Sequence, residues 1–142
     1  MSVIGGGKAP FVTPETVRFW ESVEREEVLM PTCVQCSAFF FPPSPICPRC
    51  TSRKIAWERI CGEAILYSFM IAENPWPEWG SEGPMSIAHV ELVEGPRLIS
   101  TIVGVEQSPQ ALFIGMELEI AFRRFGNRKM MCFKPQKMQV TR

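Results

Sequence analysis

The second half of the chain is a series of short apolar segments separated by glycines and prolines. The segments expected to be strands are 57–72, 85–93, 97–105, 116–125 and 129–135. Gly62 is expected to bend the first strand as a bulge, and Gly126-Asn127 to form the last turn. Five short strands, the first bent at a glycine, predict a small Greek-key barrel of the OB type.

One helix is predicted near the N-terminus. Thr13 is a suitable cap, and Pro14 fits the first helical position, where a missing N–H costs nothing. The residues on one face at three- and four-residue spacing are Val17, Trp20, Val23 and Glu24, with Phe19 to the side. The charged residues expected to form a solvated face are Glu21, Glu24, Arg25, Glu26 and Glu27. Because a short isolated helix is marginal in water, this one must dock on its own protein or on a partner.

Composition narrows the class of protein. Of the 142 residues, 46% are hydrophobic, which is enough for a packed core, and 15 Lys+Arg balance 15 Asp+Glu. Zero net charge argues against a general nucleic-acid or membrane-surface binder. No apolar run is long enough to span a membrane, and the N-terminus lacks the apolar core of a secretion signal. We therefore expect a cytoplasmic protein whose cysteines are reduced or metal-bound, and the 13 prolines favour turns over long helices.

Four of the six cysteines form two C-x2-C pairs. The predicted metal ligands are Cys33, Cys36, Cys47 and Cys50. Two such knuckles facing each other complete a tetrahedral four-sulfur site, the ligand set of one structural zinc ion. Rubredoxin-type iron uses the same ligands, usually with a longer insert, and is the second choice. Because protein fills all four positions, the site is predicted to be structural and not catalytic.

The segment between the knuckles contains Phe39, Phe40 and Phe41. A ribbon this small cannot bury three phenylalanines alone, so some are expected to pack on a neighbouring domain or a partner chain. The alternative is that all three serve the local core. Ser37 and Thr51 end the knuckles, where glycine would most easily take the left-handed conformation.

No catalytic residue is predicted. His89 is the single histidine and alternates into a strand, where histidine is usually structural. Cys61 and Cys132 lie in strand-like surroundings and are predicted to be buried thiols. The sequence has no glycine-rich phosphate loop and no G-x-S-x-G elbow.

The order of the motifs resembles the acyl-CoA-associated zinc-ribbon/OB-fold family, formerly a domain of unknown function. The resemblance runs from about residue 13 to 135 and rests on Arg18-Phe19-Trp20-Glu21, the two knuckles around Phe41-Pro42-Pro43, the segments 62–69 and 90–98, and Ile114-Gly115-Met116. It implies a mainly β protein with an N-terminal tail and docking helix (1–30), a rubredoxin-like zinc ribbon (31–56) and a five-stranded OB-fold barrel (57–142).

The resemblance also implies a non-catalytic accessory subunit. Members of the family associate with thiolase-superfamily enzymes: acetoacetyl-CoA thiolase with its synthase, acyltransferases, and aldolases acting on steroid side-chain CoA esters. The narrowest expectation is the small subunit of benzoylsuccinyl-CoA thiolase, from anaerobic toluene degradation. In such a hetero-oligomer the thiolase-like chain supplies the catalytic residues, and the small subunit stabilises its partner and helps to enclose coenzyme A.

Two groups of residues are candidates for that role. The predicted partner contacts are Phe19, Trp20, Phe39, Phe40, Trp76 and Trp79. Trp76 and Trp79 lie between prolines in the loop 73–84, which alternatively folds back over its own barrel. The possible contacts with CoA phosphates are Arg123, Arg124, Arg128 and Lys129, which could instead face an acidic partner or water.

The competing function is a single-stranded nucleic-acid-binding module, since zinc ribbons and OB barrels both serve that purpose. It would use the same basic turn, with strand aromatics as stacking platforms. Zero net charge argues against this function, as do Glu73, Glu78 and Glu82 in the loop where an OB fold would hold a strand.

Overall fold

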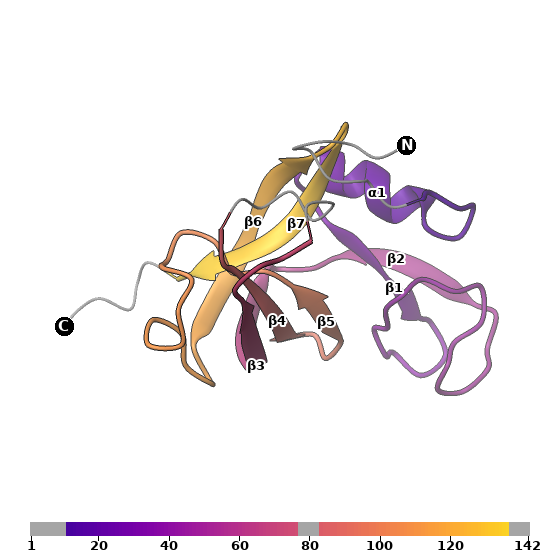
Figure 1. The fold of residues 1–142 in the computed structure, drawn as a ribbon. Coiled ribbons are helices and arrows are strands. Elements are labelled where there is room, and N and C mark those ends of the chain that lie inside the picture. Colours follow the sequence, from indigo (N-terminus) through magenta and orange to yellow (C-terminus); the bar gives the residue numbers. More distant parts are fainter. Residues whose placement is uncertain (1–10, 77–82, 137–142) are drawn as a thin grey trace.

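The computed structural model describes residues 11–76 and 83–136. Within these residues the protein is mainly β, as predicted, with one short helix (Figure 1). The elements are α1 (Val17–Glu24), β1 (Leu29–Cys33), β2 (Ile55–Arg59), β3 (Glu63–Ala72), β4 (Met85–Leu92), β5 (Arg97–Ser100), β6 (Glu117–Phe125) and β7 (Arg128–Pro135). β1 and β2 form a two-stranded sheet beside the knuckle loops, and the other strands form a curled five-stranded sheet in the order β5-β4-β3-β6-β7.

The five-stranded sheet curls into a barrel of the OB type, as predicted. A parallel bridge between Ile102 and Phe133 joins the chain just after β5 to β7. The Val103 N–H donates to the Phe133 carbonyl at 2.8 Å, and the Phe133 N–H donates to the Thr101 carbonyl at 3.1 Å. In the described residues, backbone hydrogen bonds therefore join this edge of the sheet to β7 only around the bridge, and the barrel is only partly closed.

Alternation places the core inside this barrel. In β4, Ser86, Ala88, Val90 and Leu92 are buried, and the residues between them are partly exposed. The largest fully buried side chains of the barrel include Leu66, Leu92, Ile102, Leu118 and Phe133. Burying each such side chain stabilises the fold by about 1.5–3 kcal/mol relative to exposure.

The prediction of one long bent strand over 57–72 was wrong. β2 ends at Arg59 and pairs with β1 in the ribbon, whereas β3 begins the barrel at Glu63. Between them Gly62 has a φ of +93°, a conformation that a side chain would strain, so it breaks the strand and does not merely bulge it. The predicted strand 97–105 is also shorter: β5 ends at Ser100 and only the bridge at Ile102 continues its pairing.

α1 docks on its own chain, and its buried face differs from the predicted one. Phe19 and Val23 are buried, whereas Val17 remains 39% exposed. The Phe19 ring lies 5.0 Å from the ring of Phe41, which connects the helix to the segment between the knuckles. The helix begins at Val17 after a hydrogen-bonded turn, in which the Val17 N–H donates to the carbonyl of Thr13 at 2.9 Å. The helix was expected to start at Pro14, so this turn replaces its predicted first residues.

Candidate functional site

Two similar turns form the candidate metal centre. The Ser37 N–H donates to the Cys33 carbonyl at 2.7 Å, and the Thr51 N–H donates to the Cys47 carbonyl at 2.9 Å. Ser37 and Thr51 both have a φ of 66°, the left-handed conformation expected where glycine would fit best. The two knuckles therefore have the same backbone geometry and present their thiols in the same way.

The four sulfur atoms form a cluster with the dimensions of a metal-thiolate tetrahedron. All of them lie within 4.8 Å of one another. The Cys33 and Cys50 sulfurs are 3.6 Å apart, and those of Cys36 and Cys47 are 3.8 Å apart. A Zn–S distance of about 2.3 Å gives a tetrahedral S–S edge of about 3.8 Å, whereas a disulfide needs about 2.05 Å. The four cysteines are thus arranged to bind a zinc ion, as the spacing predicted.

Backbone N–H groups stabilise negative charge on one sulfur of each knuckle. The Cys36 N–H points at the Cys33 sulfur at 3.4 Å and lowers the pKa of that thiol to about 6, against the opposing effect of burial. Burial raises the pKa of Cys47, but N–H donors, including that of Cys50 at 3.5 Å, outweigh it and the pKa is lowered. Thiolates are the form that binds zinc, so the backbone favours metal binding.

The three phenylalanines between the knuckles divide between two cores. Phe40 packs with Cys33, Cys47 and Ile55 in a small core of the ribbon. Phe39 and Phe41 pack instead against the main core, which includes α1 and the barrel. The alternative in which all three serve the local core is therefore wrong. Their burial on the main core needs no partner chain.

The residues predicted to contact a partner differ widely in exposure. Phe19 and Phe40 are buried at 4% and 7% exposure, so they offer almost no surface to another protein. Trp20 and Phe39 are partly buried against the main core. Trp76 is 66% exposed, and Trp79 lies outside the described residues. Of the six, Trp76 has the side chain most available to a partner among those described.

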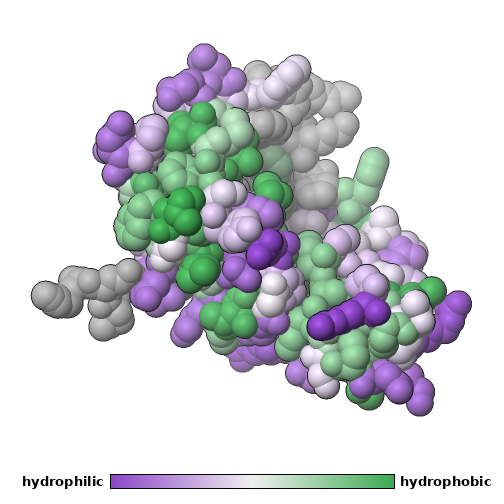
Figure 2. All heavy atoms as spheres, turned by 90° about the horizontal axis from the view of Figure 1, so that it is seen from below, coloured by the Kyte–Doolittle hydropathy of each residue, from purple (hydrophilic) through white to green (hydrophobic). Residues whose placement is uncertain are grey.

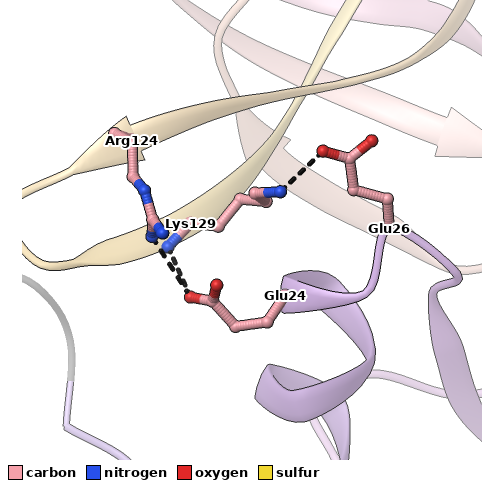
Figure 3. A network of polar contacts seen from close by, with 4 residues as sticks. All are labelled: Glu24, Glu26, Arg124 and Lys129. Atoms are coloured by element: carbon pink, nitrogen blue, oxygen red, sulfur yellow. Dashed lines mark hydrogen bonds and ion pairs between the residues drawn. The ribbon is translucent and has the colours of Figure 1, made fainter.

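The β6–β7 hairpin separates the cations that lie close together in the sequence. Arg124 and Lys129 pair across the hairpin and face α1 (Figure 3). Glu24 accepts from Arg124 Nη1 at 3.5 Å and from the Lys129 N–H at 2.8 Å, and Glu26 accepts from Lys129 Nζ at 2.6 Å. Glu24 and Glu26 are therefore not simply part of a solvated face, as had been predicted; they attach the helix to the hairpin.

The other two cations lie in different surroundings. The Arg128 guanidinium lies 5.8 Å from the ring centroid of Trp20. Arg123 is opposite Met130 across the hairpin and lines a groove between β5 and β7. No single segment of the sequence predicts this groove, because its walls come from four strands.

A hydrophobic surface on the barrel was also not predicted. The large apolar residues exposed on β3 and on the loop before β6 are Ile65, Tyr67, Met70, Phe113 and Ile114, which we call the Tyr67 patch. The loop lies against β3, because the Gly115 N–H donates to the Leu66 carbonyl at 2.8 Å. Figure 2 shows hydrophobic side chains gathered on the barrel half of the molecule.

Tyr67 is held by two neighbours. It occupies a β-bulge in β3, where the pairing with β4 shifts by one residue. The Arg97 guanidinium lies 3.9 Å from the centroid of the Tyr67 ring, and the His89 ring meets it edge-on at 5.3 Å. This packing holds a large aromatic side chain in place although it is 43% exposed.

Comparisons with known proteins agree with this architecture. Residues 20–56 match the family model of the ChsH2 rubredoxin-like zinc ribbon domain, and residues 57–123 match that of the ChsH2 C-terminal OB-fold domain. A DUF35 domain-containing scaffold protein of Methanothermobacter thermautotrophicus is 35% identical over 112 residues, which cover 78% of this chain and 83% of the relative. This chain belongs to the DUF35 family.

Two further comparisons connect the DUF35 chain to proteins with enzymatic names. A probable enoyl-CoA hydratase alpha subunit of Thermomonospora curvata is 31% identical over 109 residues, 75% of this chain but 33% of that protein. A chain of the solved Ltp2-ChsH2(DUF35) aldolase superposes with a TM-score of 0.79 and 26% identity, covering 89% of this chain and 98% of that one.

The two cysteines of the DUF35 chain outside the metal centre lie in different surroundings. Cys132 is buried, as predicted, and burial raises its pKa to about 11. The prediction that Cys61 is buried was wrong, because it lies in the exposed link between β2 and β3. Partial burial raises the pKa of the Cys61 thiol, and the Glu94 carboxylate raises it further. The hydrogen bond from the Glu63 N–H lowers the pKa but does not cancel these effects. No helix in the described part of the chain is long and apolar enough to cross a membrane.

Proposed function

We propose that this DUF35 chain is a zinc-stabilised, non-catalytic accessory subunit of a thiolase-superfamily enzyme that acts on acyl-CoA thioesters. The observation that carries the proposal is the superposition on almost the whole DUF35 chain of the two-protein Ltp2-ChsH2 aldolase. A hetero-oligomer with an enzyme partner is the arrangement that this similarity and the scaffold-protein relatives suggest. The thiolase superfamily as the partner class comes from the resemblance of the motifs.

The metal centre supports a structural role. Four thiols occupy every position of the tetrahedron, so a bound zinc ion has no open position for water or substrate. Zinc would supply the link between the two knuckles and no chemistry on a thioester. The metal would thereby stabilise the ribbon, whose Phe41 packs on Phe19 of α1.

The exposed apolar surface of the chain supports the proposal that it binds a protein partner. Tyr and Arg are enriched among the residues that carry binding energy at interfaces, and contiguous exposed apolar patches mark interaction sites. The Tyr67 patch has this composition, with Arg97 stacked on its central ring. Trp76 is a second exposed aromatic residue, and we include it with Trp79 in the proposed contact surface.

Coenzyme A contact is the finer part of the proposal. Arg124 and Lys129 are engaged by glutamates of the chain itself, so these two of the four predicted phosphate ligands have the least charge to offer a CoA phosphate. The comparisons do not single out benzoylsuccinyl-CoA thiolase, to which the motif resemblance pointed most narrowly. The proposal is therefore made for the superfamily and not for that enzyme.

The nucleic-acid alternative has less support. A single-stranded nucleic acid is held by a groove of free cations together with stacking aromatics. In this chain the hairpin cations Arg124 and Lys129 are paired with Glu24 and Glu26, so the basic turn has less positive charge to offer a phosphate backbone.

Purification of the tagged, full-length chain from its native source tests the proposal. We expect a thiolase-like protein to copurify in a fixed ratio and to be identified by mass spectrometry, with no nuclease-sensitive component. The double variant Trp76→Ala, Trp79→Ala should weaken association by about 2 kcal/mol or more while zinc content stays the same. Nucleic acid in place of an enzyme would contradict the proposal.

A further inference from the structure

A groove between β5 and β7 lies on the part of the barrel that the strands leave open. Its volume is about 270 Å³, close to the lower end of small-molecule pockets. The residues that matter most for its character are Ile87, Ile99, Phe125, Met130 and Met131, all of which are apolar. Methionines adapt their shape to different apolar ligands, so the walls suit an apolar chain of variable length.

The hydroxyl groups of the groove are already engaged. Ser86 Oγ lies 3.1 Å from Thr101 Oγ1 and accepts the Ile102 N–H at 2.9 Å. Ser100 Oγ donates to the Met131 carbonyl at 3.2 Å. The Ser100 bond joins β5 to β7 across the groove, and each of these hydroxyl groups already has a partner within the chain.

Among the described residues, Arg123 is the one charged residue that lines the groove. It also borders a second hollow of about 270 Å³ formed with residues 101–105. No carboxylate forms an ion pair with Arg123 in the part of the chain that the structure describes. Its neighbour Arg124 faces the opposite side of the hairpin and pairs with Glu24. The guanidinium of Arg123 therefore lies beside an apolar groove without a counter-charge.

We infer that this groove binds a small amphipathic carboxylate, with the apolar tail between β5 and β7 and the carboxylate on Arg123. A guanidinium recognises a carboxylate through two parallel, charge-assisted hydrogen bonds, which makes the planar anion a better fit than a neutral head group. Since the groove belongs to this chain alone, the inference does not depend on the partner enzyme.

Calorimetric titration of the zinc-loaded, full-length chain tests the inference. Decanoate, below its micelle concentration, is expected to bind with one saturable site, and decanol at least about tenfold more weakly. Arg123→Gln should weaken decanoate binding at least about tenfold, whereas the matched variant Arg124→Gln should leave it unchanged. Ile99→Asp, at a position that is 68% exposed, should abolish binding without unfolding the chain.

Three results would overturn the inference. The first is the absence of saturable decanoate binding to the wild-type chain. The second is equal loss in Arg123→Gln and Arg124→Gln, which would show a general effect of charge. The third is tighter, Arg123-dependent binding of decanoyl-CoA than of decanoate, which would assign the groove to a thioester with its phosphates.

Discussion

Lys129 and Glu26 form an ion pair with 2.6 Å between Nζ and Oε2, although they lie 103 residues apart in the sequence (Figure 3). The pair joins the start of β7 to the chain just after α1. With the contacts of Glu24, it makes the helix part of the fold of this chain. Partner docking is therefore proposed for the exposed barrel surface and Trp76, and not for the buried face of the helix.

The Lys129–Glu26 pair should contribute little to stability despite its short distance. The two side chains are 22% and 52% exposed, and solvent-exposed pairs contribute about 0–1 kcal/mol. A double-mutant cycle with Lys129→Met and Glu26→Gln, measured by urea unfolding, should give a coupling below about 1 kcal/mol that shrinks in 1 M salt. A coupling energy of several kcal/mol that does not change with salt concentration would contradict this view.

Ser22 should matter more than the ion pair. It is fully buried, donates to the Phe19 carbonyl at 2.7 Å and accepts the Leu29 N–H at 2.9 Å, so it joins α1 to β1. Ser22→Ala leaves the Leu29 N–H without a partner and should lower the free energy of unfolding by about 1–3 kcal/mol. The matched variant Glu21→Ala, at an exposed position of the same helix, should change it by less than about 0.5 kcal/mol. Equal effects of the two variants would rule out this role of Ser22.

Removal of one metal ligand should unfold the ribbon. Cys47→Ser is expected to reduce the zinc content from one equivalent to less than half, because three thiols no longer complete the tetrahedron. Cys61→Ser is the matched control, since Cys61 is an exposed cysteine outside the cluster and its loss should leave the zinc in place. The barrel should remain folded in both variants, because most buried residues of the main core lie within 60–133, although Phe39 and Phe41 of the ribbon pack against it. Elemental analysis of the wild type that finds neither zinc nor iron would contradict the assignment of the site.

Cys132 should make stability depend on alkaline pH. Burial raises the pKa of its thiol from 9.0 to about 11, so the folded chain keeps a proton that the unfolded chain loses between these values. Its contribution is fully present below pH 9 and is lost as the pH rises toward 11. The difference in unfolding free energy between wild type and Cys132→Ala should therefore narrow over this range, by at most about 1.4 kcal/mol per pH unit. Comparing the two proteins cancels the other titrating groups, and parallel pH curves would contradict the prediction.

Local patterns in the sequence predicted the elements that depend on short-range rules. The C-x2-C spacing located the metal ligands, because each knuckle is a tight turn. Alternation located β4, where every second residue is buried. The pattern could not show that 57–72 contains two strands of different sheets. Trp57 pairs with Pro31, which is distant in the sequence, so the apolar pattern around Trp57 does not reveal this pairing.

Long-range contacts explain what the sequence did not predict. Phe19 is buried because Phe41 packs on it. Helical spacing alone placed Val17 on the predicted apolar face and Phe19 to its side. The four cations of the hairpin form one cluster in the sequence, but strand alternation sends Arg123 and Arg124 to opposite faces. The groove and the Tyr67 patch combine residues of several strands, so neither is visible in any one segment.

The activity of the partner enzyme with and without this chain tests the central claim most directly. CoA-dependent carbon–carbon bond cleavage of an acyl-CoA should be measured for the copurified complex, for each separated protein and for the remixed proteins. The account predicts turnover by the complex, none by this chain alone, reduced activity or stability of the separated enzyme, and recovery on remixing. Turnover by the isolated chain, or an enzyme whose activity and stability do not change when the chain is removed, would contradict it.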